Sequence, residues 1–146
     1  MKVRSELQGF RLIDRISRAG SEEIRGVCTL AGGPLFTLIE ALAQLGALHV
    51  RYLTGFTRHA FLLKIARCTL PGGVPAAGVC PLRGRQTARS TTTFAYHLEA
   101  GREGALLMEG EFLFATLDYD GRFAREALAR HYEMLFSCLT NDSKTA

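Results

Sequence analysis

The stretch "GGPLFTLIEALAQLGALHV", residues 32–50, joins a helix start signal to a long apolar helical pattern. Two glycines and Pro34 break the preceding chain, and proline is favoured at the first position of a helix. Leucine, isoleucine and alanine then occupy most of the helix circumference, which is typical of a buried helix. We therefore predict a buried helix from Leu35 to about Tyr52. It contains one carboxylate, Glu40, and an apolar helix holds a carboxylate at a cost in free energy.

The composition fits a single domain that spans residues 1–146. The chain is 47% hydrophobic and 22% charged, which is close to an average globular protein. It contains no run of about 18 apolar residues and no apolar signal-peptide core, so we expect a cytoplasmic protein without a membrane span. The formal charge is only +4, and the arginines are dispersed without base-stacking aromatic motifs. We therefore expect no nucleic-acid partner.

The four cysteines predict neither a metal site nor a disulfide framework. Cys28, Cys68, Cys80 and Cys138 form no C-x-x-C pair, and none has a histidine at zinc-ligand spacing. We expect buried thiols, no metal and no cofactor. Cys28 precedes the helix, but no neighbouring histidine or aspartate in the sequence would activate it as a nucleophile.

The rest of the chain reads mostly as strands. Alternating or β-branched segments bounded by glycine and proline predict strands on both sides of the buried helix, and a second helix at the C-terminus. One buried helix beside a run of antiparallel strands indicates an α+β domain whose sheet wraps the helix. The expected strands are residues 9–18, 22–30, 59–70, 88–100 and 105–120, with a loop leading into strand at 74–86, a terminal helix at 122–139 and a frayed tail at 140–146.

Several segments resemble the 3-hydroxyacyl acyl-carrier-protein dehydratases of bacterial fatty-acid synthesis (the FabA/FabZ type). "LIEALAQLGA" (38–47) is similar to the central helix of that family. "FRLIDRI" (10–16) is similar to its opening strand, "KIARCTLPGG" (64–73) to a strand that ends in a Pro-Gly turn, and "GALLMEGEFLFA" (104–115) to its last strand. The resemblance implies a hot-dog fold over residues 7–120, in which a curved antiparallel sheet wraps one long helix.

The resemblance also implies site residues. The family's catalytic carboxylate maps onto Glu40, and its motif glutamine maps onto Gln44, one turn later on the same helix face. The family's catalytic histidine would fall at Gly26, and no histidine occurs before His49. His59 is the best substitute, because it begins the strand where a backbone amide of the family grips the thioester carbonyl.

The same comparison makes His59 and Ala60 candidates for substrate binding, together with Gly33, Pro34 and Gln44. The glycines before Pro34 would let a thioester approach the helix N-terminus, where backbone N–H groups favour an oxygen with developing negative charge. A tight loop-to-helix turn is the alternative. His49 lies about 13 Å beyond Glu40 along the helix axis, too far for direct pairing.

Three roles remain open for Glu40: a catalytic group, a structural residue that hydrogen-bonds across a dimer interface, or a solvated residue. The surrounding leucines argue against an exposed helix face. Burial would raise the pKa of Glu40, as a general acid requires.

The remaining polar candidates are of two kinds. His97 and His131 are expected to be packed or solvated, and Arg67, Arg83, Arg85 and Arg89 form either a basic rim for a pantetheine phosphate or a solvated strand edge.

The function that the resemblance implies is dehydration of a 3-hydroxyacyl thioester, carried by acyl carrier protein or coenzyme A, with Glu40 as acid/base. Dehydration needs one group to take a proton and another to deliver one. Without the histidine, the chain would be degenerate or dependent on a partner. We expect a homodimer, or a heterodimer with a paralogous hot-dog subunit, joined edge to edge between sheets. The alternatives are a hot-dog acyl thioesterase, whose carboxylate activates water, and a non-catalytic acyl-binding or scaffold subunit.

Overall fold

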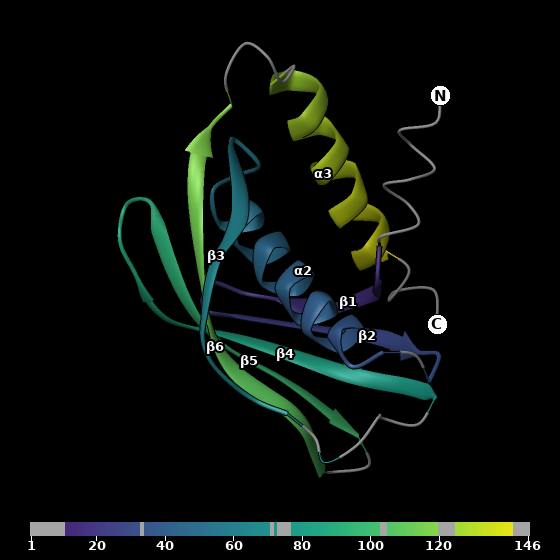
Figure 1. Cartoon of the computed structure of the whole chain (residues 1–146). Helices are drawn as coiled ribbons and strands as arrows, with labels where there is room; N and C mark the ends of the chain where they lie inside the picture. Colours follow the sequence, from purple (N-terminus) through teal and green to yellow (C-terminus); the bar gives the residue numbers. More distant parts are fainter. Residues whose placement is uncertain are drawn as a thin grey trace.

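The computed structural model describes residues 11–32, 34–70, 72, 77–102, 105–119 and 125–141. It has two helices and six strands in these parts of the chain (Figure 1). The elements are β1 (Ile13–Ala19), β2 (Glu23–Leu30), α2 (Phe36–Leu53), β3 (Arg58–Thr69), β4 (Gly78–Arg89), β5 (Thr93–Arg102), β6 (Ala105–Asp118) and α3 (Arg125–Asn141). Neither helix is long and apolar enough to cross a membrane.

The six strands form one antiparallel sheet in the order β1-β2-β4-β5-β6-β3. The segment α2–β3 is inserted between the neighbouring strands β2 and β4, so β3 crosses to the far edge and pairs with β6. The sheet therefore has two edges, β1 and β3. Figure 1 shows the sheet curving around α2, which confirms the expected α+β hot-dog architecture.

The concave face of the sheet is apolar because alternate residues of each strand point toward α2. In β6 the residues with even numbers from Met108 to Thr116 are buried, and their neighbours are half-buried. The α2 helix contributes the opposite wall of this core. The largest fully buried side chains are Tyr96, Phe94, Phe112, Phe114, Ile13, Ile16, Ile24, Leu38, Leu42, Leu45, Leu98 and Met108.

The α2 helix approaches the sheet closely at Gly46. A Cβ atom built on Gly46 would overlap the ring of Phe114, with Cε2 at 2.5 Å and Cζ closer still. Phe114 is fully buried on β6. The missing side chain of Gly46 is thus the space that the Phe114 ring fills, and it sets the separation between helix and sheet.

The second helix, α3, lies on the side of α2 that faces away from the sheet (Figure 1). It also packs against β1. The ring of Phe136 on α3 stacks on Tyr52 with centroids 5.0 Å apart, and it meets Phe56 edge-on at 5.6 Å. These contacts hold α3 over the C-terminal half of α2.

Several expected boundaries were wrong. The strand expected at 88–100 is divided, because a turn at residues 90–92 separates β4 from β5 and the Ser90 side chain bonds the Thr93 backbone N–H at 3.1 Å. The final strand ends at Asp118, and the C-terminal helix begins at Arg125 and runs to Asn141. The expected helix residues 122–124 lie outside the described residues.

We predict that Gly46→Ala destabilises the fold, although alanine is the better helix former. Without an obstacle the change would gain up to about 1 kcal/mol. Here Phe114 must move, and overpacking of this kind costs about 1–3 kcal/mol. Urea unfolding of both proteins measures the difference. A G46A variant more stable than the wild type would contradict the close approach of Phe114.

Candidate functional site

Glu40 is exposed on the face of α2 that points away from the sheet. The leucines of α2 turn toward the sheet, whereas Glu40 shares its face with Phe36, one turn earlier, and Gln44, one turn later. The expected burial of Glu40 was therefore wrong for the single chain. The apolar residues around Glu40 in the sequence lie mainly on the other side of the helix, and α3 does not reach this far.

Gln44 positions the Glu40 carboxylate. Its Nε2 group donates to Glu40 Oε1 at 3.4 Å, a long hydrogen bond. Its Oε1 atom accepts a hydrogen bond from the backbone N–H of Leu12 at 2.9 Å. Because the amide oxygen is engaged by the chain just before β1, the amide nitrogen is directed at the carboxylate. The expected placement of Glu40 and Gln44 on one face of the helix is confirmed.

The start of α2 lies one turn before Glu40. Pro34 is exposed, and its carbonyl accepts from the backbone N–H of Thr37 at 3.1 Å. The N-cap residue, Leu35, has no side chain that can cap the helix. Gly33, the other candidate here, lies outside the described residues.

His59 and Ala60 lie at the opposite end of α2 from Glu40. The Ala60 carbonyl accepts a hydrogen bond of 2.7 Å from Nη2 of Arg51, in the last turn of the helix. Arg51 follows Glu40 by eleven residues, which is about 16 Å along a helix. Burial and the charge of Arg51 lower the pKa of His59. Within one chain, the structure does not bring His59 or Ala60 to Glu40.

The position expected for the family's histidine has no room for a side chain. Gly26 lies in the middle of β2 and is buried. A Cβ atom there would stand 2.9 Å from the Arg15 carbonyl oxygen and 3.1 Å from Leu45 Cδ1. The residues before α2 that resembled a histidine-bearing loop are thus partly strand, and Gly26 packs against the helix.

His49 is fully buried and structural. Its Nε2 atom lies 2.7 Å from the Gly20 carbonyl oxygen, which can only accept, so Nε2 carries the proton. Its Nδ1 atom lies 2.5 Å from the Tyr96 hydroxyl and accepts from it. Burial lowers the pKa of His49 and raises the pKa of Tyr96. This neutral pair links α2 to β5 and to the β1–β2 turn through buried hydrogen bonds.

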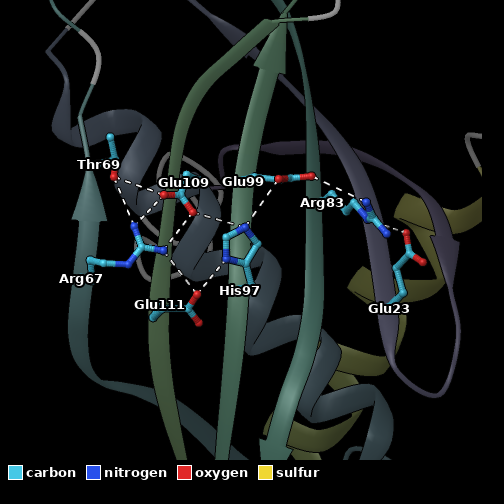
Figure 2. A network of polar contacts seen from close by, with 8 residues as sticks. All are labelled: Glu23, Arg67, Thr69, Arg83, His97, Glu99, Glu109 and Glu111. Carbon is cyan, nitrogen blue, oxygen red and sulfur yellow. Dashed lines mark hydrogen bonds and ion pairs between the residues drawn. The ribbon is translucent and has the colours of Figure 1, made fainter.

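Arg67, Arg83 and His97 belong to an ion-pair network on the convex face of the sheet, remote from α2 (Figure 2). His97 is central, with Nδ1 at 2.8 Å from Glu111 and Nε2 at 3.3 Å from Glu109. The Arg67 guanidinium binds Glu109 at 2.6 Å and holds the pKa of that carboxyl at about 2. Arg83 binds Glu23 at 3.0 Å.

This network bears on whether the strand arginines form a phosphate-binding rim or a solvated strand edge. Arg67 and Arg83 already have carboxylate partners, so they fit a solvated, charge-paired surface rather than a phosphate-binding rim. Arg85 is exposed, and the Arg89 guanidinium lies 5.3 Å from the Phe94 ring centroid. Among the residues that the structure describes, no group of His, Cys, Asp and Glu side chains is arranged to hold a metal ion.

The cysteines are thiols without disulfides. Cys28 and Cys80 are buried on adjacent strands, and Cys80 and burial raise the pKa of Cys28, which argues against a nucleophilic role. The expectation of burial was wrong for Cys138, which is exposed on α3, and only partly right for Cys68, which is half-buried.

Arg51 is the polar residue that sequence reasoning missed. Its side chain is 6% exposed, and its guanidinium carbon lies 3.8 Å from the centroid of the Tyr132 ring of α3. The signal was present in the sequence, because Gln44, Ala47 and Arg51 follow Glu40 by four, seven and eleven residues and so share its helix face. The sequence predicted the C-terminal helix but not that this helix packs over Arg51.

No family model and no curated protein matches the chain in sequence. Solved structures match its fold. A conserved protein of Pseudomonas aeruginosa superimposes with a TM-score of 0.64 at 18% identity, covering 78% of this chain and 93% of the other. A variant of a thioesterase from the same organism gives 0.62 at 13% identity, covering 80% and 86%. A hypothetical thioesterase of Streptococcus pneumoniae with coenzyme A gives 0.58 at 14% identity, covering 73% and 88%. At these identities the likeness establishes the hot-dog fold.

We predict that the buried His49 makes stability fall below about pH 6.5. The pKa of His49 is lowered in the folded state, so the unfolded chain binds more protons below its own pKa of about 6.5, and the free energy of unfolding drops as the pH falls. The His49→Gln variant is expected to be less stable near neutral pH and to lose less stability on acidification. Chemical unfolding at about pH 7.5 and about pH 5.5 measures this. Parallel losses in both proteins would contradict the assignment.

Proposed function

We propose that the protein hydrolyses an acyl thioester of coenzyme A or acyl carrier protein, with Glu40 as the general base. The observation that carries the proposal is the exposed Glu40 carboxylate, which accepts a hydrogen bond from Gln44, a residue that also lines a groove along α2. The fold likeness to proteins described as thioesterases, one of them solved with coenzyme A, agrees with it.

Hydrolysis suits a site with one acid–base group. A water oxygen attacks the carbonyl carbon of the thioester while Glu40 accepts a proton from that water. The carbon–sulfur bond then breaks, and the sulfur leaves as a thiol with the proton that Glu40 returns. An uncapped helix start one turn away offers backbone N–H groups to the carbonyl oxygen as its negative charge develops.

Dehydration of a 3-hydroxyacyl thioester is the second candidate, and it requires a second acid–base group. Gly26 has no space for the family's histidine. One observation keeps this candidate: His59 begins the edge strand β3, so His59 of the partner subunit could complete the site at Glu40. A heterodimer with a histidine-bearing paralogue would satisfy the same need. Failure of both reactions would favour an acyl-binding subunit.

A dimer joined along β3 follows from the nature of that edge. β3 has twelve residues, and within the described sheet its only partner is β6. A long edge strand with exposed apolar side chains favours pairing with another chain. Leu63 is 54% exposed, and Leu62 and Ile65 are also exposed. A second copy of the chain paired antiparallel along β3 would cover them.

The Glu40→Gln variant is expected to lose thioester hydrolysis by about 10²-fold to 10⁴-fold, because the amide cannot take a proton from water. Release of free thiol from acyl-coenzyme A measures the rate. The matched control is Glu133→Gln, which neutralises an exposed carboxylate on α3 and should keep full activity. Undiminished turnover by E40Q would exclude Glu40 as the base.

Light scattering during size-exclusion chromatography should give the wild type twice its chain mass of 16.0 kDa. The Leu63→Asp variant should elute as a monomer, because a charge at the paired edge opposes association. Met134→Asp, at an equally exposed site on α3, is the control and should stay dimeric. A monomeric wild type would refute the dimer, and a dimeric L63D would move its interface away from β3.

A further inference from the structure

Arg51 is a buried cation without a carboxylate in the described part of the chain. Only 6% of the residue is exposed to solvent. Its Nη2 group donates to the Ala60 carbonyl, whereas its Nε group has no hydrogen-bond partner among the described residues. Burial lowers the pKa of this guanidinium, and the polar side chains beside it are the phenols of Tyr132 and Tyr119, which are neutral at about pH 7. Isolated buried charges are costly, so an anion is the expected complement.

Arg51 lies in the wall of a groove of about 170 Å³ between α2, α3 and the start of β1. The groove follows the helix face that begins at Glu40. Gln44, which bonds Glu40, is in one part of the wall, and Arg51 lies two turns further on. Most of the wall is apolar, and its polar members are all neutral or basic. The lining residues are Arg11, Ile13, Gln44, Ala47, Leu48, Arg51, His131, Tyr132 and Leu135.

We infer that this groove binds the acyl part of the substrate and that Arg51 binds a carboxylate at its far end. The preferred substrates are then thioesters of dicarboxylic acids, with the thioester at Glu40 and the second carboxylate at Arg51. The volume of the groove, about 170 Å³, sets the scale of the acyl chain. The inference rests on the proposed hydrolase function for the placement of the thioester.

The chemistry of the groove favours a carboxylate over the phosphates of coenzyme A. The volume of about 170 Å³ is below the range of about 300–1,000 Å³ typical of pockets for larger ligands, and a nucleotide would leave its charges against apolar walls. Tyr132 covers one face of the guanidinium, and the Ala60 carbonyl and the Tyr119 side chain occupy part of its edge, which leaves the remaining N–H groups for a ligand. A carboxylate matches that edge with charge-assisted hydrogen bonds, which a buried site strengthens.

The first arm of the test compares kcat/KM for suberyl-coenzyme A and octanoyl-coenzyme A, which differ in the terminal carboxylate. The wild type should prefer the suberyl thioester by about 10-fold to 100-fold, the value of one charged hydrogen-bonded contact. Arg51→Gln should lose that preference, whereas Arg51→Lys should retain part of it. Equal rates for both thioesters in the wild type would overturn the inference.

The second arm measures binding alone, so that it does not depend on catalysis. Calorimetric titration of the wild type with suberate and with octanoate should detect tighter binding of suberate. Ala47→Phe, which fills the groove without touching the charge of Arg51, should abolish the difference, and a melting curve verifies that each variant is folded. Suberate binding without thioester hydrolysis would uphold the groove and refute the hydrolase. Hydrolysis with no selective suberate binding would refute the groove and leave the hydrolase intact.

Discussion

The contact between Gly46 of α2 and the Phe114 ring of β6 determines how the two faces of the central helix are used. It seats the helix in the concave sheet and turns the leucines of α2 inward. The opposite face, which carries Glu40, Gln44 and Arg51, is thereby directed away from the sheet. One close approach thus separates a face that stabilises the fold from a face that is available for chemistry.

That second face changes character along the helix. At its N-terminal end Glu40 is exposed, and at its C-terminal end Arg51 is roofed by Tyr132 of α3. In the proposed hydrolysis, an aqueous environment suits a carboxylate that would activate water, and a low-dielectric environment would strengthen the binding of an anion by the guanidinium. The stacking of Phe136 on Tyr52 holds α3 over the C-terminal half of α2. This partial cover is the reason that solvent exposure of the face decreases from Glu40 to Arg51.

Much of the fold could be predicted from sequence, because the helix at 32–50 and the alternating strands carry strong local periodicity. The register of Gln44 behind Glu40 followed from helix geometry alone. The exposure of Glu40 could not be predicted, since a helix with apolar residues nearly all round does not indicate which side the sheet will take. The partners of Arg51 and His97 were also hidden, because they come from strands and a helix distant in the sequence.

The candidate chemistry depends on which groups reach Glu40. The place expected for a histidine is filled by packing at Gly26, and His59 stands at the far end of the same helix. The proposed hydrolysis needs only the carboxylate that one chain provides. Dehydration needs a second acid–base group, which a second subunit would have to provide. The choice between the two reactions therefore depends on whether a second acid–base group lies beside Glu40.

A product analysis with 3-hydroxyoctanoyl-coenzyme A tests that point most directly, because this one substrate can undergo either reaction. Mass spectrometry after incubation with the wild-type protein distinguishes the products. The account predicts free coenzyme A and 3-hydroxyoctanoate in equal amounts, with no loss of the hydroxyl group. An enoyl thioester with its carbon–sulfur bond intact would contradict it and would assign the site to dehydration.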